Sequence, residues 1–537
     1  MYVSAVLAVI VGVLVWIFYR QRKQKYSFFK DRGIPGPQPN ILFANAVQLQ
    51  ELGPSQTVRK WTQKYGSTYG YYESANTPVL VTSDLDVIQQ VFVKEFSKFS
   101  ARKLFAIGDD PSKPENISMF LAEGFRWKRL RSIVSPAFST NKMKKMTPLV
   151  QDCIGTMMES LDAKNKQGKT FDILQIFQGL TLDVIASVAF GIQVQSQSNP
   201  SDPFLVACRH VFSRLQPDKM PFAVKAMLTS AVALPEFKSF LRVLFAPVKN
   251  AWMTGFLKKK CMEIIKDRKQ NPTGRPDFLT IMLAAETENI DFENERSVYR
   301  NEAITEEKTT NTSVLSGGKM FAKRLTINEI KSNSELFLIA GYETTSNALG
   351  YAAYELALNP DKQEKLQENI DEFTPDGEAP NYTNIQKMQY LDMVLNEVLR
   401  LHPIAPSVTS RRCLKDVMIN GILVKEGVSI LPDVLTIHND PEVWGPTDPS
   451  LFDPERFSPE AQENRHPMAF LSFGAGPRNC IGMRFALLEA KLALANVMKK
   501  YTIVKTDEME VPLMTSEGGT ITPAHGVKVM IQARNEN

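Results

Sequence analysis

Hydrophobic and polar residues alternate along this chain in patterns that predict a helix-rich fold. Residues 2–19 form one uncharged apolar run. Helical periodicity then dominates from about residue 120 to about residue 405. Short apolar runs at 415–432, separated by Asn-Gly and Glu-Gly, predict β hairpins, and the segment 503–531 is similar. We therefore expect a mainly α protein with a minor β portion.

The first apolar run approaches the length of about 20 residues that a membrane-crossing helix needs. Four basic residues follow it at once: Arg20, Arg22, Lys23 and Lys25. This order differs from that of a cleaved secretory signal, and it predicts a membrane anchor over 1–25 with everything downstream in the cytosol. A buried N-terminal helix is the alternative. The prolines and glycines of 26–40 predict a stiff hinge, and 41–537 is expected to form a single domain.

Hydrophobic periodicity disappears between 286 and 319, where polar residues and glycine predict a long solvated loop. Directly after it, Thr326 and Glu329 have the spacing of a capping box. The helical pattern then continues to Pro360, which predicts a helix of about 33 residues, long enough to cross a whole domain.

Composition and charge exclude several classes of protein. The 537 residues are 43% hydrophobic and 23% charged, as in ordinary globular proteins, and the net charge of +5 is too small for a charge-driven nucleic-acid binder. The five cysteines lie far apart and include no CxxC, so neither a disulfide framework nor a zinc knuckle is expected. This pattern is typical of a reducing compartment.

One cysteine stands where it can bind a metal. Cys480 ends the glycine-rich segment 473–482 and precedes a predicted helix from Met483 to about Lys499. Amide groups at the start of a helix favour the thiolate, which is the form that binds metals, and glycines leave room for a flat macrocycle. A buried structural cysteine in a glycine-rich loop is the alternative.

The sequence FGAGPRNCIG resembles the haem-binding signature of the cytochrome P450 family, Phe-x-x-Gly-x-Arg-x-Cys-x-Gly, at every fixed position. The resemblance implies the P450 fold, a helix-rich triangular body with small sheets, and haem b as cofactor. It further implies that Cys480 is the axial ligand of the iron, that Phe473 packs beside the thiolate, and that Arg478 binds a haem propionate. A thiolate ligand favours cleavage of the O–O bond.

Three further motifs resemble the family's in the same order along the chain. Glu397 and Arg400 match the Glu-x-x-Arg pair, and Arg456 supplies the third charge that locks the loop around the haem. Within the long helix, the resemblance makes Glu343 and Thr344 the pair that relays protons during oxygen activation. Gly341 is costly in a helix, about 1 kcal/mol relative to alanine, and we expect it to let the helix open locally.

The last matches concern the haem propionates. Trp127 and Arg131 lie on one helical face and resemble the family's Trp-x-x-x-Arg element. Arg102 and Arg411 also resemble propionate partners. His402 and His438 are expected to be structural, since a histidine ligand would duplicate the role of the cysteine. Without the resemblance, each of these motifs is also compatible with ordinary helix interiors and solvated charge pairs.

The resemblance is closest to the drug- and steroid-oxidising enzymes of the animal endoplasmic reticulum, although the 286–319 loop is longer than is usual there. It implies a monooxygenase of lipophilic small molecules, anchored in that membrane, which takes electrons from NADPH through a separate reductase and also from cytochrome b5. No GxGxxG follows a predicted strand, so an external donor is needed. Five basic residues are candidate docking charges: Lys128, Arg129, Lys142, Lys144 and Lys145. A peroxide isomerase and a catalytically silent haem protein are the alternatives.

Overall fold

The computed structural model describes residues 2–103, 117–215, 230, 232–234, 237, 240, 255–272, 277–287 and 324–534. Of the polar loop predicted at 286–319, residues 288–319 lie outside the described residues. The chain forms two compact units. Unit 1 consists of Met1–Gly108, Pro217–Trp252 and Pro406–Ile437, and unit 2 consists of Asp109–Gln216, Met253–Ala405 and His438–Asn537. The expectation that residues 41–537 form a single domain stays a prediction.

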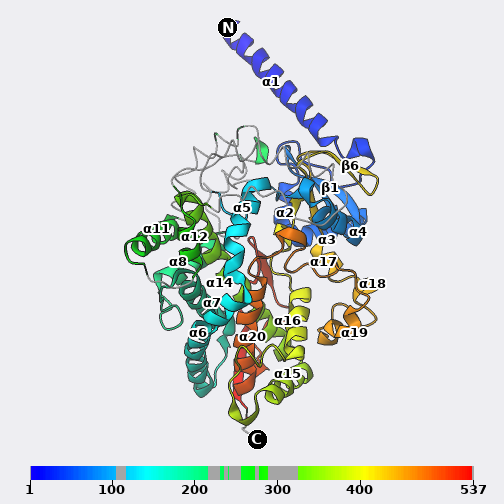
Figure 1. Cartoon of the computed structure of the whole chain (residues 1–537). Coiled ribbons are helices and arrows are strands. Elements are labelled where there is room, and N and C mark those ends of the chain that lie inside the picture. Colours follow the sequence, from blue (N-terminus) through cyan, green and yellow to red (C-terminus); the bar gives the residue numbers. More distant parts are fainter. Residues whose placement is uncertain are drawn as a thin grey trace, which may run out of the picture. The chain divides into compact units, whose positions relative to one another are not determined.

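Unit 1 begins with helix α1, which Figure 1 shows as one long unbroken helix. The helix spans Tyr2–Tyr26, and none of its apolar part is buried; this part has the length and hydropathy of a membrane span. After it, the segment predicted as a hinge packs closely on strand β1 (Thr68–Ser74). The amide of Gly70 donates to the carbonyl of Pro35 at 2.8 Å, and a Cβ at Gly36 would collide with the carbonyl of Gly70.

The rest of unit 1 is built on a four-stranded sheet in the order β1-β2-β7-β4. Strand β2 is antiparallel to β1 and parallel to β7. Strands β5 and β6 form a separate hairpin whose turn residues, Asn420 and Gly421, both have positive φ, as an Asn-Gly turn requires. The elements are α2 Ala46–Glu51, α3 Pro54–Tyr65, β2 Thr77–Thr82, α4 Leu85–Gln89, β4 Arg411–Arg412, β5 Val417–Ile419, β6 Ile422–Val424, β7 Ser429–Pro432 and α17 Val434–Ile437.

Unit 2 is helical, and its core is a layer of long helices that lie side by side in Figure 1. Helix α14 (Ile327–Leu358) packs most extensively against α7 (Ile173–Phe190), and α7 packs in turn against α6 (Thr140–Gln167). Helix α20 (Met483–Lys500) contacts both α6 and α14. Helix α7 is apolar enough to pass as a membrane span, but 72% of it is buried, as expected for a core helix.

The remaining elements of unit 2 surround these helices. The capping box at Thr326 and Glu329 is present, and the helix that it begins has 32 residues, so both predictions are confirmed. Strands pair in the orders β3-β11-β8 and β10-β9. The elements are α5 Gly124–Val134, β3 Phe171–Asp172, α8 Pro203–Leu215, α11 Gly255–Gln270, α12 Phe278–Ala284, α15 Pro360–Phe373, α16 Gln389–Leu401, α18 Pro441–Trp444, α19 Pro459–Gln462, β8 Tyr501–Lys505, β9 Thr515–Glu517, β10 Ile521–Pro523 and β11 Lys528–Ala533. The helix-rich fold class is confirmed.

Candidate active site

The loop that carries Cys480 is closed by its own backbone. The amide of Cys480 donates to the carbonyl of Phe473, a half-buried residue, at 2.8 Å. Gly474 and Gly476 both have φ of 67°, a conformation that favours glycine. Cys480 is the one exposed cysteine of the five, since Cys153 is half-buried and the other three are buried. The loop therefore presents a single exposed cysteine three residues before α20 begins.

A cation from helix α5, Arg131, acts on Cys480. Arg131 donates to the carbonyl and the side-chain oxygen of Asn479, at 2.7 and 2.8 Å. Burial lowers the pKa of the Arg131 guanidinium, and the negative charge of Cys480 acts in the opposite direction. A positive charge on Arg131 thus favours the thiolate of Cys480, as do the free amides at the start of α20.

Arg478 joins the same loop to α5. Its guanidinium is buried, bonds to the carbonyl of Ala122 and lies 5.0 Å from the centre of the Trp127 ring. The structure therefore brings Trp127, Arg131, Arg478 and Cys480 into one cluster in unit 2.

Arg102 and Arg411, the other two predicted propionate partners, belong to unit 1. Arg102 donates to the carbonyl of Val408 at 2.6 Å. Arg411 is buried, donates to the carbonyl of Ser410 at 2.9 Å, and lies 4.1 Å from the centre of the Phe92 ring. Their assignment to the propionates stays a prediction.

Gly341 in helix α14 has a packing role that the sequence does not indicate. A Cβ at this position would lie 2.8 Å from two side-chain atoms of Ile185 in α7. One helical turn before Ile185, the hydroxyl of Thr181 donates to the carbonyl of Tyr342 at 2.7 Å. Because α14 is continuous through this region, the expected local opening is not observed. The glycine instead allows α7 to approach closely.

Glu343 and Thr344 point to different neighbours. Thr344 donates to the carbonyl of Ala340 at 2.7 Å, and Ala340 is one of two exposed residues of α14, the other being Asn328 near the start of the helix. The carboxyl of Glu343 is buried and bonds to the hydroxyl of Thr520. Burial raises its pKa to about 8, although the Thr520 hydrogen bond acts to lower it. Within the described residues, no hydrogen bond joins the two side chains.

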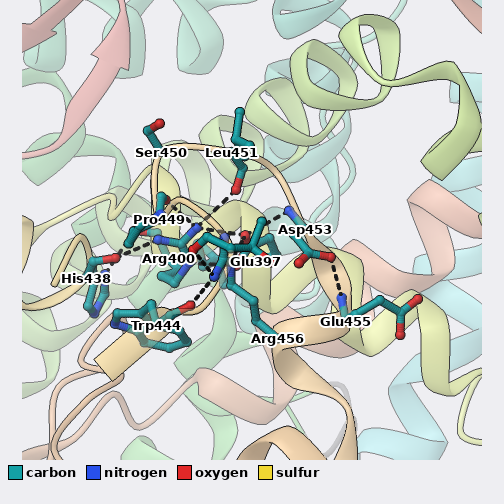
Figure 2. A network of polar contacts seen from close by, with 12 residues as sticks. Glu397, Arg400, His438, Trp444, Pro449, Ser450, Leu451, Asp453, Glu455 and Arg456 are labelled. Carbon is teal, nitrogen blue, oxygen red and sulfur yellow. Dashed lines mark hydrogen bonds and ion pairs between the residues drawn. The ribbon is translucent and has the colours of Figure 1, made fainter. Parts of the chain in front are cut away.

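Glu397, Arg400 and Arg456 form one buried ion cluster, shown in Figure 2. Arg400 donates to both carboxylate oxygens of Glu397, at 2.6 and 2.7 Å, and Nε of Arg456 lies 3.3 Å from Glu397 Oε1. The amide of Asp453 also donates to that oxygen, at 3.0 Å. The cluster thus joins helix α16 to the segment 453–457. That it locks the loop around the haem stays a prediction.

His438 connects this cluster to the Cys480 loop. Its ring bonds to the Arg400 carbonyl through Nδ1 at 3.0 Å, and its Nε2 accepts the amide of Leu471 at 2.9 Å. Burial lowers the pKa of His438 to about 3, so the ring is neutral and structural. His402 bonds to Glu355 at 2.6 Å and stacks on Tyr351.

The candidate docking charges are not all on the surface. Lys128, Lys144 and Lys145 are exposed, and Lys142 is half-buried. Including Arg129 among them was wrong, because it is buried and pairs with Glu329 at 2.7 Å. Glu329 also accepts a bond from Arg126 at 2.9 Å, so α5 is tied to the start of α14.

Sequence reasoning missed the functional contacts of Thr520, Thr181 and Glu329. Each partner lies more than 150 residues away in the chain, and neither Thr520 nor Thr181 stands in a recognisable motif. The capping box drew attention to Glu329, but only as a local feature of one helix.

The residues around Cys480 fit a haem. The exposed sulfur is accompanied by a half-buried and a buried guanidinium, which can neutralise a thiolate and the carboxylates of a porphyrin. Ala340 is exposed although most of α14 around it is buried, so side chains do not cover this face of the helix. Both observations agree with a flat, anionic macrocycle held by the sulfur.

Comparison with known proteins identifies relatives along nearly the whole chain. The family model described as cytochrome P450 matches residues 34–531. The chain is 35% identical to a putative cytochrome P450, CYP13A4, of Caenorhabditis elegans, over 95% of this chain and 96% of the relative. It is 33% identical to cytochrome P450 3A11 of Mus musculus and 32% identical to cytochrome P450 3A7 of Homo sapiens, in each case over 98% of this chain and 96% of the relative.

Proposed function

The chain belongs to the cytochrome P450 family of haem b monooxygenases, and we propose that it oxidises a lipophilic small molecule with electrons from NADPH through a separate reductase. The proposed substrate is a xenobiotic, a steroid or a fatty-acid-like compound. The observation that carries the proposal is the single exposed sulfur of Cys480 in its cationic loop.

We propose that Cys480 is the axial ligand of the haem iron. Haem bound through a thiolate supplies the cleavage of dioxygen. The positive charge of Arg131 and the start of α20 favour the thiolate, and the bond between Cys480 and Phe473 fixes the loop. Trp127, Arg131 and Arg478 of unit 2 are the proposed partners of the haem propionates. The same role for Arg102 and Arg411 is proposed from the resemblance alone.

Proton delivery is assigned to Glu343 and Thr344. The Thr344 hydroxyl lies beside the uncovered face of α14 at Ala340, where it can pass a proton to a bound reactant. A carboxyl whose pKa is about 8 retains its proton at neutral pH and can donate it. Glu343 is therefore the proposed proton source and Thr344 the proposed relay.

Helix α1 supports a single-pass anchor in the endoplasmic reticulum membrane, with the rest of the chain in the cytosol. It has the length and hydropathy for one crossing, and none of its apolar part is buried. The exposed residues Lys128, Lys144 and Lys145 offer positive charge to an acidic electron donor, which we propose to be the NADPH-cytochrome P450 reductase, with cytochrome b5 as a second donor.

The proposal is tested with Thr344→Ala and, as control, Thr344→Ser in the purified full-length enzyme with reductase and NADPH. A screen of lipophilic compounds by binding spectra first identifies a substrate. We expect Thr344→Ala to consume NADPH but release mainly hydrogen peroxide, because the hydroxyl relay is lost, while Thr344→Ser keeps product formation. Turnover of a peroxide without reductase, unchanged in both variants, would instead identify an isomerase.

A further inference from the structure

Thr520 is the hydrogen-bond partner of the buried carboxyl of Glu343, and it comes from a distant part of unit 2. It is the last residue of the turn that connects β9 to β10, directly before β10 begins at Ile521. Both side chains are buried, with exposed fractions of 4% for Glu343 and 9% for Thr520. The Thr520 hydroxyl donates to Oε2 of Glu343.

The hairpin that carries Thr520 is fixed to the same face of α14 one turn further on. Asn347 Nδ2 donates to the carbonyl of Ile521 at 3.3 Å, and the hydroxyl of Thr522 bonds to Asn347 Oδ1 at 3.1 Å. Positions 343 and 347 lie one above the other on a helix. The hairpin therefore contacts α14 along one line, with Thr520 opposite Glu343.

This contact directs Glu343 away from Thr344. Successive residues of a helix are about 100° apart around its axis, so the two side chains leave α14 in different directions. Thr344 bonds to Ala340 within its own helix, and Glu343 bonds to the hairpin. A proton can pass from the acid to the relay only if the Glu343 carboxyl leaves Thr520 or a water molecule bridges the gap.

We propose that Thr520 is a positioning residue that holds the Glu343 carboxyl in its resting orientation and lowers its affinity for the proton. The inference rests on the proposed role of Glu343 as proton source. It adds that the β9–β10 hairpin determines when the acid gives up its proton, because releasing the carboxyl requires breaking the bond to Thr520.

Thr520 is the group that opposes the effect of burial on the pKa of Glu343. Burial and the Thr520 hydroxyl are the two influences on the pKa of Glu343. The titratable neighbours that feel its charge are Tyr342 and Tyr351 of α14 and Cys208 of α8. Burial raises the pKa of each of them, so all three stay neutral near pH 7. Removing the hydroxyl should therefore raise the proton affinity of Glu343.

The test follows the carbonyl stretch of protonated Glu343 by infrared spectroscopy in the full-length haem-loaded enzyme. The band is assigned by its absence in Glu343→Gln, and its loss is followed from pH 6 to pH 10. In the wild type we expect a midpoint near pH 8. In Thr520→Val the midpoint should rise by about one to two pH units and the band should move to higher frequency, because a bond to the carboxyl is lost.

Thr520→Ser is the matched control, since it keeps the hydroxyl and should restore both the midpoint and the band. A midpoint that stays unchanged in Thr520→Val, or a serine variant that behaves like valine, overturns the positioning role. The proposed function is examined separately through Glu343→Gln, which should release more hydrogen peroxide per NADPH. If peroxide release does not change in Glu343→Gln, the role of Glu343 as proton source fails, and the inference about proton release fails with it.

Discussion

The buried ion cluster around Glu397 yields a stability prediction that can be worked out from the contacts. The substitution Glu397→Gln keeps the size of the side chain and removes its charge. The carboxylate accepts two bonds from Arg400 and one from the amide of Asp453, and it lies 3.3 Å from Arg456. Arg465 also feels its charge. After the substitution, several guanidinium groups share a buried region without a counter-charge.

The expected loss is large. Removing one partner of a buried ion pair costs about 3–5 kcal/mol, because the remaining charge is left without a partner in a low-dielectric interior. A typical folded domain has only about 5–15 kcal/mol of net stability. With a urea m value of about 3 kcal/mol per M or more, the unfolding midpoint should fall by about 1 M.

The assay follows urea unfolding of unit 2 through tryptophan fluorescence, because Trp444 and Trp127 are both buried there. The matched control is Asp416→Asn, which removes the exposed partner of Lys425 in unit 1 and should leave the midpoint unchanged. If Glu397→Gln unfolds at the same urea concentration as the wild type, the cluster is not the stabilising element that its geometry indicates.

Two further substitutions test other parts of unit 2. Gly341→Ala should destabilise the protein by about 1–3 kcal/mol, because the new Cβ would lie 2.8 Å from side-chain atoms of Ile185. Adding Ile185→Ala to the same chain should recover part of this loss, as measured by a double-mutant cycle of thermal unfolding. Glu489→Gln should stabilise the protein at pH 8 but not at pH 4.5. Burial raises the pKa of the Glu489 carboxyl well above its usual value, so the folded protein keeps a proton that the unfolded chain releases. The stability of the wild type therefore falls as the pH rises above the pKa of Glu489 in the unfolded chain. Equal unfolding midpoints for Glu489→Gln and wild type at pH 8 would contradict this reasoning.

Patterns that are local in the chain predicted most of the fold. The capping box and apolar periodicity of α14, the Asn-Gly turn between β5 and β6, and the apolar run of α1 all depend on near neighbours. Such features can be read from a short window of sequence. The family, inferred from the loop around Cys480 and three further motifs, is confirmed by the match over residues 34–531.

Contacts between distant segments could not be read in the same way. The sequence gives no sign that Thr520 would face Glu343, 177 residues earlier, or that Gly341 serves the close approach of Ile185. Arg129 was a candidate docking charge from its sequence alone, and only the fold brings Glu329 next to it. Helical periodicity shows which face of a helix is buried, but not which partner covers that face.

The bond between Cys480 and the haem iron is tested most directly by the absorption spectrum of the reduced, carbon-monoxide-treated protein. The wild type should show the red-shifted band of a thiolate-bound ferrous haem, and Cys480→Ser should lose it. Cys153→Ser, which changes a half-buried cysteine in α6, should retain it. A wild type without the red-shifted band, or a Cys480→Ser variant that keeps it, would contradict the account.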